Sequence, residues 1–453
     1  MTQFNFANDF NVSFPGDYAI YLPAINEGYA PFTDRQLDVG RAVPQGFEIK
    51  DLAFWSGQSA LWNYPYYLHS VGCYSVGKDP RGPLFRRAPN TSFFLGDSGG
   101  FQIGKGSLDG LEGSLYQGMP GVLAVDAWES NYDAKRWIIE WLDRYADYAM
   151  TLDMPLWAMT AKGVKSPFHN CTEEQLTEMT VRNLKSISKL KDGRTRWLNV
   201  VQGTNWSNTQ RWWQAVNWFK GSGWSLAGTA GWLGGLGDML RTVVMMREDK
   251  AFDPGMNVLH VLGTSQAKWA IFLTAIQREL RAVNPELQVT FDSATAFVCG
   301  GKQDQYAVLP LLGSDRKNWA VKLVTLPKTR GYANQNNAEP FPAASPLGSQ
   351  LLMHHLVCRD DEFEKNRMDP LSNMMLINHN VWVYLDLVKR ANDAAFGPIQ
   401  NIPDEFAAAL DAIADVFVDQ NPMDRIDAYQ SLFDRVAPVV INDPEVDLDL
   451  EGP

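Results

Sequence analysis

Five positions in this sequence stand out because each lies at or just beyond the end of an apolar run with the composition of a buried strand. They are Asp97, Asp153, Gln202, Gly228 and Asp292. Carboxylates transfer protons or attack carbon as nucleophiles, and a side-chain amide both donates and accepts hydrogen bonds. One aspartate after a strand usually caps a turn or a helix. Several at the ends of strands in one sheet indicate instead a site built from carboxylates.

Alternating strand-like and helix-like runs must position these residues. Apolar runs that end in turns predict strands at 91–96, 197–203, 224–231, 257–263 and 287–293. Amphipathic runs predict helices at 137–150, 173–190, 207–220 and 373–396. Repeated strand–turn–helix units are typical of a parallel sheet, and their number favours an α/β fold with a closed (β/α)₈ TIM barrel. The active site of such a barrel lies at the carboxyl ends of its strands, so the five positions should converge.

Two of the expected helices carry capping signals. Thr172 should be the N-cap of the helix at 173–190. Ser207 and Gln210 should form the capping box of the next helix, which Gly221 should stop.

Three regions are expected along the chain. Residues 1–400 should form the barrel domain, with the early strands in the first ninety residues and a loop-rich inserted subdomain at about 317–372. Residues 401–453 should form an acidic helical extension with one amphipathic helix and a mobile tail.

Composition excludes several classes of protein. With 45% hydrophobic and 20% charged residues, the 453-residue chain is neither disordered nor fibrous. It has no apolar run of about eighteen residues, which excludes a membrane-spanning helix, and its opening residues lack a secretion signal. The four cysteines are too few and too scattered for a disulfide framework. These features predict a cytoplasmic protein, in the host cytoplasm if a phage encodes it.

The net charge of −12 is concentrated at one end of the chain. Residues 401–453 contain thirteen acidic and two basic residues, a net charge of −11, which leaves −1 for the first 400 residues. A nearly neutral body can carry a local basic groove, so a phosphate-rich partner is compatible with this acidity.

Seven short strings, taken together and in order, resemble the tRNA-guanine transglycosylase superfamily. They are DSGGFQ (97–102), LDMP (152–155), VQG (201–203), LAGT (226–229), HVLGT (260–264), FDSA (291–294) and INHN (377–380). The resemblance covers about residues 90–396. It implies exchange of a purine base through a covalent glycosyl-enzyme intermediate, as in retaining glycosidases.

The resemblance also implies roles for individual residues. Asp292 would be the nucleophile and Asp97 the general acid and base. The substrate-binding positions would be Ser98, Phe101, Asp153, Gln202, Gly228, Thr229 and Leu262. Phe101 and Leu262 would stack on the two faces of the base. Asp153 and Gln202 would read its polar edge, and the amide of Gly228 or Thr229 would bind its carbonyl.

A structural zinc site is where the sequence departs from the family. Family members that act on tRNA carry three clustered cysteines followed by a distant histidine. Here His379 matches the histidine, but only Cys358 lies upstream, beside His354 and His355. Either a rearranged zinc site uses Cys358, His379 and one of His354 and His355, or no metal binds.

This departure bears on the substrate. Without the cysteine cluster or an appended RNA-binding domain, the sequence is most similar to the DpdA-type 7-deazaguanine DNA transglycosylases. These replace guanine in DNA with 7-cyano-7-deazaguanine (preQ0) or a relative and protect the DNA from restriction. The expected partners are therefore DNA and a free 7-deazaguanine base. A guanosine in duplex DNA would have to flip out of the stack.

Two groups of residues could contact the nucleic acid. Candidate phosphate contacts are Lys78, Arg81, Arg86, Arg87, Lys317, Lys322, Lys328 and Arg330. Seven tryptophans lie between residues 197 and 232, and most of them should pack the outer layer of the barrel.

Two alternative functions stay open from the sequence. One is the same exchange on tRNA, and the other is a non-catalytic binding subunit, which the presence of both Asp97 and Asp292 disfavours. No external cofactor is expected, because the exchange is neither a redox reaction nor a phosphoryl transfer. A homodimer is compatible with the sequence.

Overall fold

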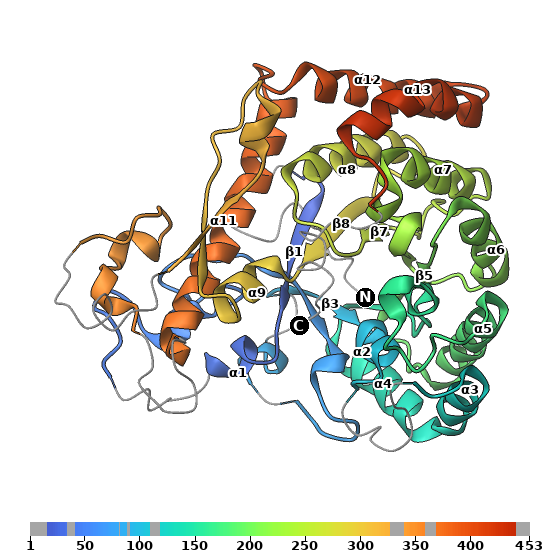
Figure 1. Ribbon diagram of the computed structural model, residues 1–453, viewed down its shortest axis with the longest axis horizontal. Helices are drawn as coiled ribbons and strands as arrows, with labels where there is room; N and C mark the ends of the chain where they lie inside the picture. Colours follow the sequence, from blue (N-terminus) through green and yellow to red (C-terminus); the bar gives the residue numbers. More distant parts are fainter. Residues whose placement is uncertain are drawn as a thin grey trace.

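Eight parallel strands close into a barrel in the computed structural model (Figure 1). The model describes residues 16–33, 41–80, 82–87, 91–108, 118–326, 339–357 and 368–440. The strands, in order around the ring, are β1 (Ile20–Ile25), β2 (Tyr66–Ser70), β3 (Phe93–Asp97), β4 (Tyr148–Met150), β5 (Arg196–Val201), β6 (Gly223–Leu226), β7 (Val258–Val261) and β8 (Gln288–Ser293). The ring closes where β8 pairs with β1, with Asp292 opposite Leu22. The predicted TIM barrel is confirmed, and two of its strands lie in the first ninety residues, as expected.

Helices follow the strands and cover the outside of the barrel (Figure 1). They are α1 (Tyr29–Phe32), α2 (Gly100–Lys105), α3 (Gly121–Ser130), α4 (Tyr132–Tyr145), α5 (Glu173–Leu190), α6 (Trp206–Val216), α7 (Gly235–Glu248), α8 (Ala267–Leu280), α9 (Thr295–Gly301) and α11 (Pro370–Phe396). The predicted helix at 173–190 is confirmed, and the Thr172 hydroxyl accepts a hydrogen bond from the Gln175 amide as its N-cap.

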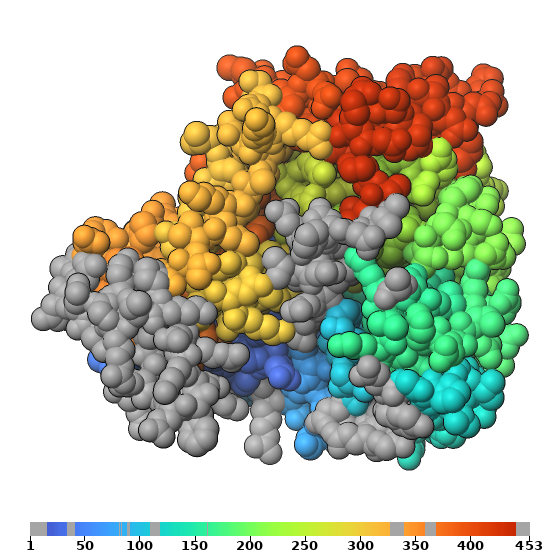
Figure 2. Space-filling model, in the orientation of Figure 1, coloured from blue at the N-terminus to red at the C-terminus, as the bar shows by residue number. Residues whose placement is uncertain are grey.

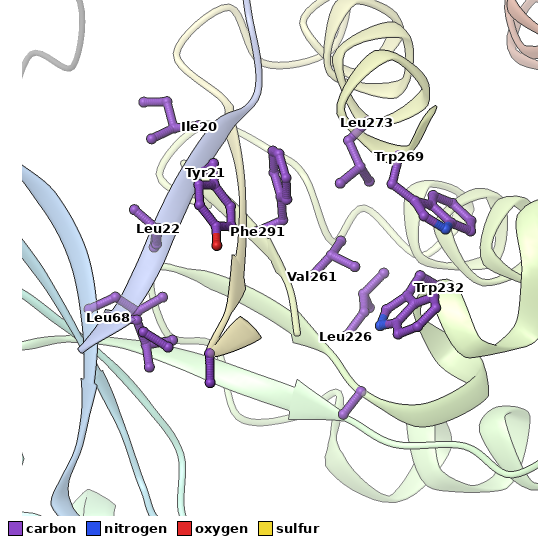
Figure 3. Close-up of a cluster of buried hydrophobic side chains, with 14 of the residues drawn as sticks. Ile20, Tyr21, Leu22, Leu68, Leu226, Trp232, Val261, Trp269, Leu273 and Phe291 are labelled. Atoms are coloured by element: carbon purple, nitrogen blue, oxygen red, sulfur yellow. The ribbon is translucent and has the colours of Figure 1, made fainter. Parts of the chain in front are cut away.

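Strand alternation divides the core into an inner and an outer layer. Figure 3 shows Tyr21 and Phe291 on the side of β1 and β8 that faces Trp269 and Leu273 of α8. Leu22 points the other way, toward Leu68. The side chains that alternate with the outer layer therefore fill the barrel, and the last of them on each strand reach its carboxyl end.

Several boundaries differ from the sequence prediction. The strand expected at 224–231 ends at Leu226, because the glycines that follow form 3₁₀ turns instead. The helix expected at 137–150 ends at Tyr145, and Tyr148–Met150 forms β4 instead. Three residues are too few to show the alternation of a strand. The apolar residues of β4 therefore looked like a continuation of the helical pattern before them. The expected capping box of Ser207 and Gln210 is also wrong, because Asn205 and Asn208 cap α6, which ends at Val216.

The C-terminal extension contains two helices where one was predicted. α12 (Asp404–Val418) and α13 (Pro422–Val436) lie along α8 and α7 at one edge of the molecule (Figures 1 and 2). Phe406 of α12 packs edge-to-face on Phe272 of α8. The predicted mobile tail, residues 441–453, lies outside the described residues.

The predicted inserted subdomain at 317–372 is described in part. β10 (Lys322–Thr325) lies within it and pairs antiparallel with β9 (Gln305–Val308), which precedes the predicted region. Residues 339–357 contain short 3₁₀ turns, and residues 327–338 and 358–367 lie outside the described residues. Among the described helices, none is both long enough and apolar enough to cross a bilayer.

Tryptophan burial agrees with the sequence analysis. Trp197, Trp212, Trp213, Trp224 and Trp232 are buried, as expected for the outer layer of the barrel. Trp218 alone of the seven between residues 197 and 232 is largely exposed, at 46%.

Candidate active site

Three aspartates from different strands meet at the carboxyl end of the barrel. Asp97 is the last residue of β3, Asp292 lies one residue before the end of β8, and Asp153 follows β4 by three residues. β1 and β2 lie between β8 and β3, with Ser70 opposite Asp97 and Leu22 opposite Asp292. We call Asp97, Asp153 and Asp292 the three site aspartates. The sequence prediction that they converge is confirmed.

Asp97 is held through one of its two carboxylate oxygens. The Ser70 hydroxyl donates a hydrogen bond of 2.6 Å to Oδ2, and the Gly99 amide donates one of 3.2 Å to the same atom. Within the described residues, Oδ1 has no hydrogen-bond donor. The half-buried carboxylate is thus fixed on one side and can act on the other.

The turn that follows Asp97 requires glycine. Gly99 has a φ of +77°, which L side chains rarely adopt, and a Cβ there would lie 3.1 Å from the backbone of Gly72. The next residue, Gly100, passes close to Asp153, because a Cβ on Gly100 would lie 3.5 Å from Asp153 Oδ1. The two glycines of the DSGGFQ string therefore bring the Asp97 turn against a second site aspartate.

Burial sets the electrostatics of Asp97. Loss of solvent raises the pKa of its carboxyl group, while the hydrogen bonds from Ser70 and Gly99 lower it. The negative charge of Asp292 raises this pKa further, so the two carboxylates interact electrostatically. A raised pKa lets a carboxyl group hold a proton near neutral pH, as a general acid requires.

Asp292 is also held through one oxygen. Its Oδ1 lies 3.1 Å from Nε2 of His260 on β7 and accepts a hydrogen bond of 3.0 Å from the Gly263 amide. The other ring nitrogen of His260, Nδ1, lies 2.9 Å from the Thr290 hydroxyl. In the described part of the chain, no donor binds Oδ2 of Asp292, which leaves this oxygen for chemistry.

Asp153 and Gln202 form a buried pair. Nε2 of Gln202 donates a 2.6 Å hydrogen bond to Oδ2 of Asp153, and each residue is 5% exposed. Burial raises the pKa of Asp153 to about 7; the Gln202 hydrogen bond opposes this, and the charge of Asp97 adds to it. The pair presents a carboxylate oxygen beside an amide oxygen, a combination that binds the N–H groups of a flat heterocycle.

The predicted carbonyl contact can involve only one of its two candidates. The Thr229 amide donates a 2.8 Å hydrogen bond to the Gly203 carbonyl, so it is already occupied. Gly228, with a φ of +61°, crosses the same carbonyl so closely that a Cβ would lie 2.2 Å from the oxygen. Of the two alternatives, the Gly228 amide is therefore the better candidate for this contact.

The remaining predicted base contacts lie at the same end of the barrel. Phe101 is half-buried on α2, with the Trp157 ring 5.6 Å away and the Lys105 ammonium 4.3 Å above its ring. Leu262 is half-buried directly after β7. Ser98 is buried, at 1% exposure.

The predicted zinc site does not fit the residues that are described. Both ring nitrogens of His379 are engaged, Nδ1 with the Ser345 hydroxyl at 2.8 Å and Nε2 with the Ala307 carbonyl at 2.9 Å. A zinc ion would have to displace one of these partners. Cys358 lies outside the described residues, and within them no three histidine, cysteine or acidic residues are placed to hold a metal.

One of the candidate phosphate contacts is structural. Arg87 pairs with Asp147 at 2.8 Å and donates to the Ser92 carbonyl at 2.7 Å. Asp147 and Ser92 both lie directly before strands. Arg87 therefore stabilises the amino end of the barrel, opposite the three site aspartates. Of the other candidates, Lys78, Arg86, Lys317 and Lys322 are exposed, whereas Arg81, Lys328 and Arg330 lie outside the described residues.

The sequence analysis missed the residues that hold the site aspartates, which are Ser70, His260, Gly263 and Thr290. His260 lies in the matched HVLGT string but was not singled out. Its neighbours become visible only once the register is known, because β7 and β8 pair with His260 opposite Thr290.

No protein-family model matches the chain, and no curated protein sequence matches it. The fold and site together define an α/β barrel with a carboxylate cluster at the carboxyl ends of its strands.

Proposed function

We propose that this protein is a base-exchanging transglycosylase that replaces guanine in DNA with a 7-deazaguanine base of the preQ0 type. The observation that carries the proposal is the pairing of Asp97 with Asp292. Each carboxylate is anchored by hydrogen-bond donors at one oxygen and has no donor at the other among the described residues, and the charge of Asp292 acts on Asp97. Two carboxylates in this arrangement suit a double displacement at a sugar carbon.

In the first half-reaction, Oδ2 of Asp292 attacks C1′ of the nucleotide. The new C1′–O bond replaces the bond from C1′ to N9 of guanine, whose electron pair leaves with the base. Asp97, with its raised pKa, gives its proton to that base. The products are free guanine and a DNA strand held on Asp292 as a glycosyl ester.

The second half-reaction reverses these roles. The incoming 7-deazaguanine loses its N9 proton to Asp97, and N9 then forms a bond to C1′ as the bond to Oδ2 breaks. The proton count is unchanged over the cycle, so no external acid, oxidant or reductant is consumed. Asp292 and Asp97 return to their starting states.

The Asp153–Gln202 pair supports a guanine-like base as the exchanged group. Guanine and 7-deazaguanines share the N1–H and exocyclic amino donors, which match the carboxylate and amide oxygens of this pair. The Gly228 amide would meet the carbonyl of the base. Ionised Asp153 accepts a hydrogen bond from its base donor better than the protonated acid does, so binding should strengthen as pH rises through about 7.

Two features support DNA rather than tRNA as the polymer. The three-cysteine cluster of tRNA-acting relatives is missing from the sequence, and both nitrogens of His379 bind protein atoms. A modified guanine in DNA would block restriction enzymes, which gives the exchange a protective role.

Labelled guanine offered with separate pools of guanine-containing DNA and tRNA tests the proposal. We expect label in DNA, a covalent protein–DNA adduct on denaturation, and loss of both in Asp292→Asn. Asp253→Asn is the matched control, because Asp253 is exposed in the turn before β7, away from the site. Label in tRNA alone would overturn the choice of polymer. Binding without label in either pool would indicate a non-catalytic subunit, and abasic sites without incorporation would indicate a hydrolase.

A further inference from the structure

His260 lies between Asp292 and Thr290 in the barrel interior, and its side chain is fully buried, at 0% exposure. Its Nε2 faces Asp292 Oδ1 and its Nδ1 faces the Thr290 hydroxyl. β7 and β8 place all three side chains on the inner side of the barrel, because His260 pairs with Thr290 and Asp292 is two residues further along. The proposed exchange mechanism assigns no role to His260.

The contacts fix which hydrogen His260 presents. An ionised carboxylate only accepts hydrogen bonds, so Nε2 must carry the hydrogen toward Asp292. The Thr290 hydroxyl can donate to Nδ1 or accept from it, so it holds the second ring nitrogen in either case. The Gly263 amide donates to the same carboxylate oxygen, so Oδ1 receives two donors.

We propose that His260 is the positioning residue of the nucleophile, which directs Oδ2 of Asp292 at C1′ and stabilises the carboxylate when it leaves. This inference rests on the proposed function. Two donors on Oδ1 prevent the carboxylate from rotating and leave Oδ2 as the attacking atom. In the second half-reaction the C1′–Oδ2 bond breaks and the electron pair returns to the carboxylate, whose charge the His260 N–H and the Gly263 amide then share.

The proposal predicts a specific kinetic pattern. His260→Phe fills the space without a donor, so we expect kcat for exchange to fall about 10- to 100-fold, the range for a lost hydrogen bond to a charged group. The KM for free guanine should change less than about threefold, because His260 does not contact the Asp153–Gln202 pair. His260→Gln keeps a donor for Oδ1 and should recover most of kcat.

The test measures exchange of labelled guanine into a guanine-containing single-stranded oligodeoxynucleotide and into tRNA, with the covalent adduct trapped by denaturation. Thr290→Val leaves His260 in place and should lower kcat in the same manner but by less. His379→Phe removes an equally buried histidine on α11, outside the barrel, and should keep kcat within about twofold of wild type. This control separates loss of stability from loss of positioning.

Each outcome decides one question. If the wild type exchanges guanine and His260→Phe keeps its kcat, the role of His260 is refuted while the proposed function stands. If His260→Phe and His260→Gln are equally impaired, the ring acts by packing and the inference also fails. If the wild type labels neither polymer and forms no adduct, the proposed function fails and this inference fails with it. Nitrogen NMR adds a measurement independent of activity, because a His260 ring without hydrogen on Nε2 would refute the assigned contact.

Discussion

Replacing Asp153 by asparagine should stabilise the protein at neutral and alkaline pH but not at acidic pH. Asparagine has nearly the same shape, and its side-chain oxygen can still accept the 2.6 Å hydrogen bond from Gln202. What the substitution removes is a charge that burial opposes. The pKa of Asp153 is raised from 3.8 to about 7, with burial as the largest cause.

The size and sign of the effect follow from linkage between proton binding and folding. Below pH 4 the folded and unfolded states both hold the proton, and the wild type loses nothing. Between pH 4 and 7 the folded state holds a proton that the unfolded state releases, so stability falls as pH rises. Above pH 7 the full cost is reached. At 1.36 kcal/mol per pKa unit it is about 4 kcal/mol.

Thermal or urea unfolding of wild type and Asp153→Asn between pH 4.5 and 8.5 measures this difference. We expect a difference of about 1 kcal/mol at pH 4.5, where the unfolded state has already released most of this proton, and a rise to a plateau above pH 7.5, with the variant more stable. Asp253→Asn, at an exposed turn, controls for the loss of one negative charge. A difference that is constant over the pH range, or one that grows toward acidic pH, would refute the reasoning. The same variant should bind guanine more weakly, so stability and base binding change in opposite directions.

Three further predictions concern Asp97 as the general acid, the glycine turn that follows it, and the expected zinc site. Asp97→Asn should slow guanine exchange about 10²- to 10⁴-fold without lowering the melting temperature, and activity above a tenth of wild type would contradict its role as the acid. Gly99→Ala should cost about 2–4 kcal/mol in urea unfolding, because it adds a contact with the Gly72 backbone to the strain of its positive φ. Gly77→Ala, with a φ of +81° and nothing within 4 Å, should cost only about 1–2 kcal/mol, and equal losses would show that the contact is unimportant. Prolonged treatment with a chelator should leave the thermal transition unchanged, since both His379 nitrogens bind protein atoms; a lower transition would reveal a metal.

Much of the barrel could be predicted from the sequence because its signals are local. The strand at 287–293 and the helix at 173–190 have clear patterns, and the Thr172 cap needs only four consecutive residues. β4 could not be separated from the helix before it, because its three residues are as apolar as the buried face of that helix. α13 was not predicted, because residues 401–453 were interpreted mainly by their acidic charge.

The candidate site also combines residues that the sequence reveals locally with residues that depend on strand pairing. The three site aspartates end or follow strands, which a sequence shows directly. The residues that hold them depend on which strands are neighbours and in what register. Ser70 reaches Asp97 across the β2–β3 ladder, and His260 reaches Asp292 across the β7–β8 ladder. No spacing along one chain encodes such pairs.

Closure of the ring by β8 on β1 means that the reacting groups come from opposite halves of the polypeptide. A cut in the exposed turn at 191–194 would leave Asp97 and Asp153 on one fragment and Gln202 and Asp292 on the other. Neither fragment alone would contain all the groups that the proposed exchange requires. Two such fragments, each fused to one member of an interacting pair, would form a split-enzyme reporter whose output is a chemically marked nucleic acid.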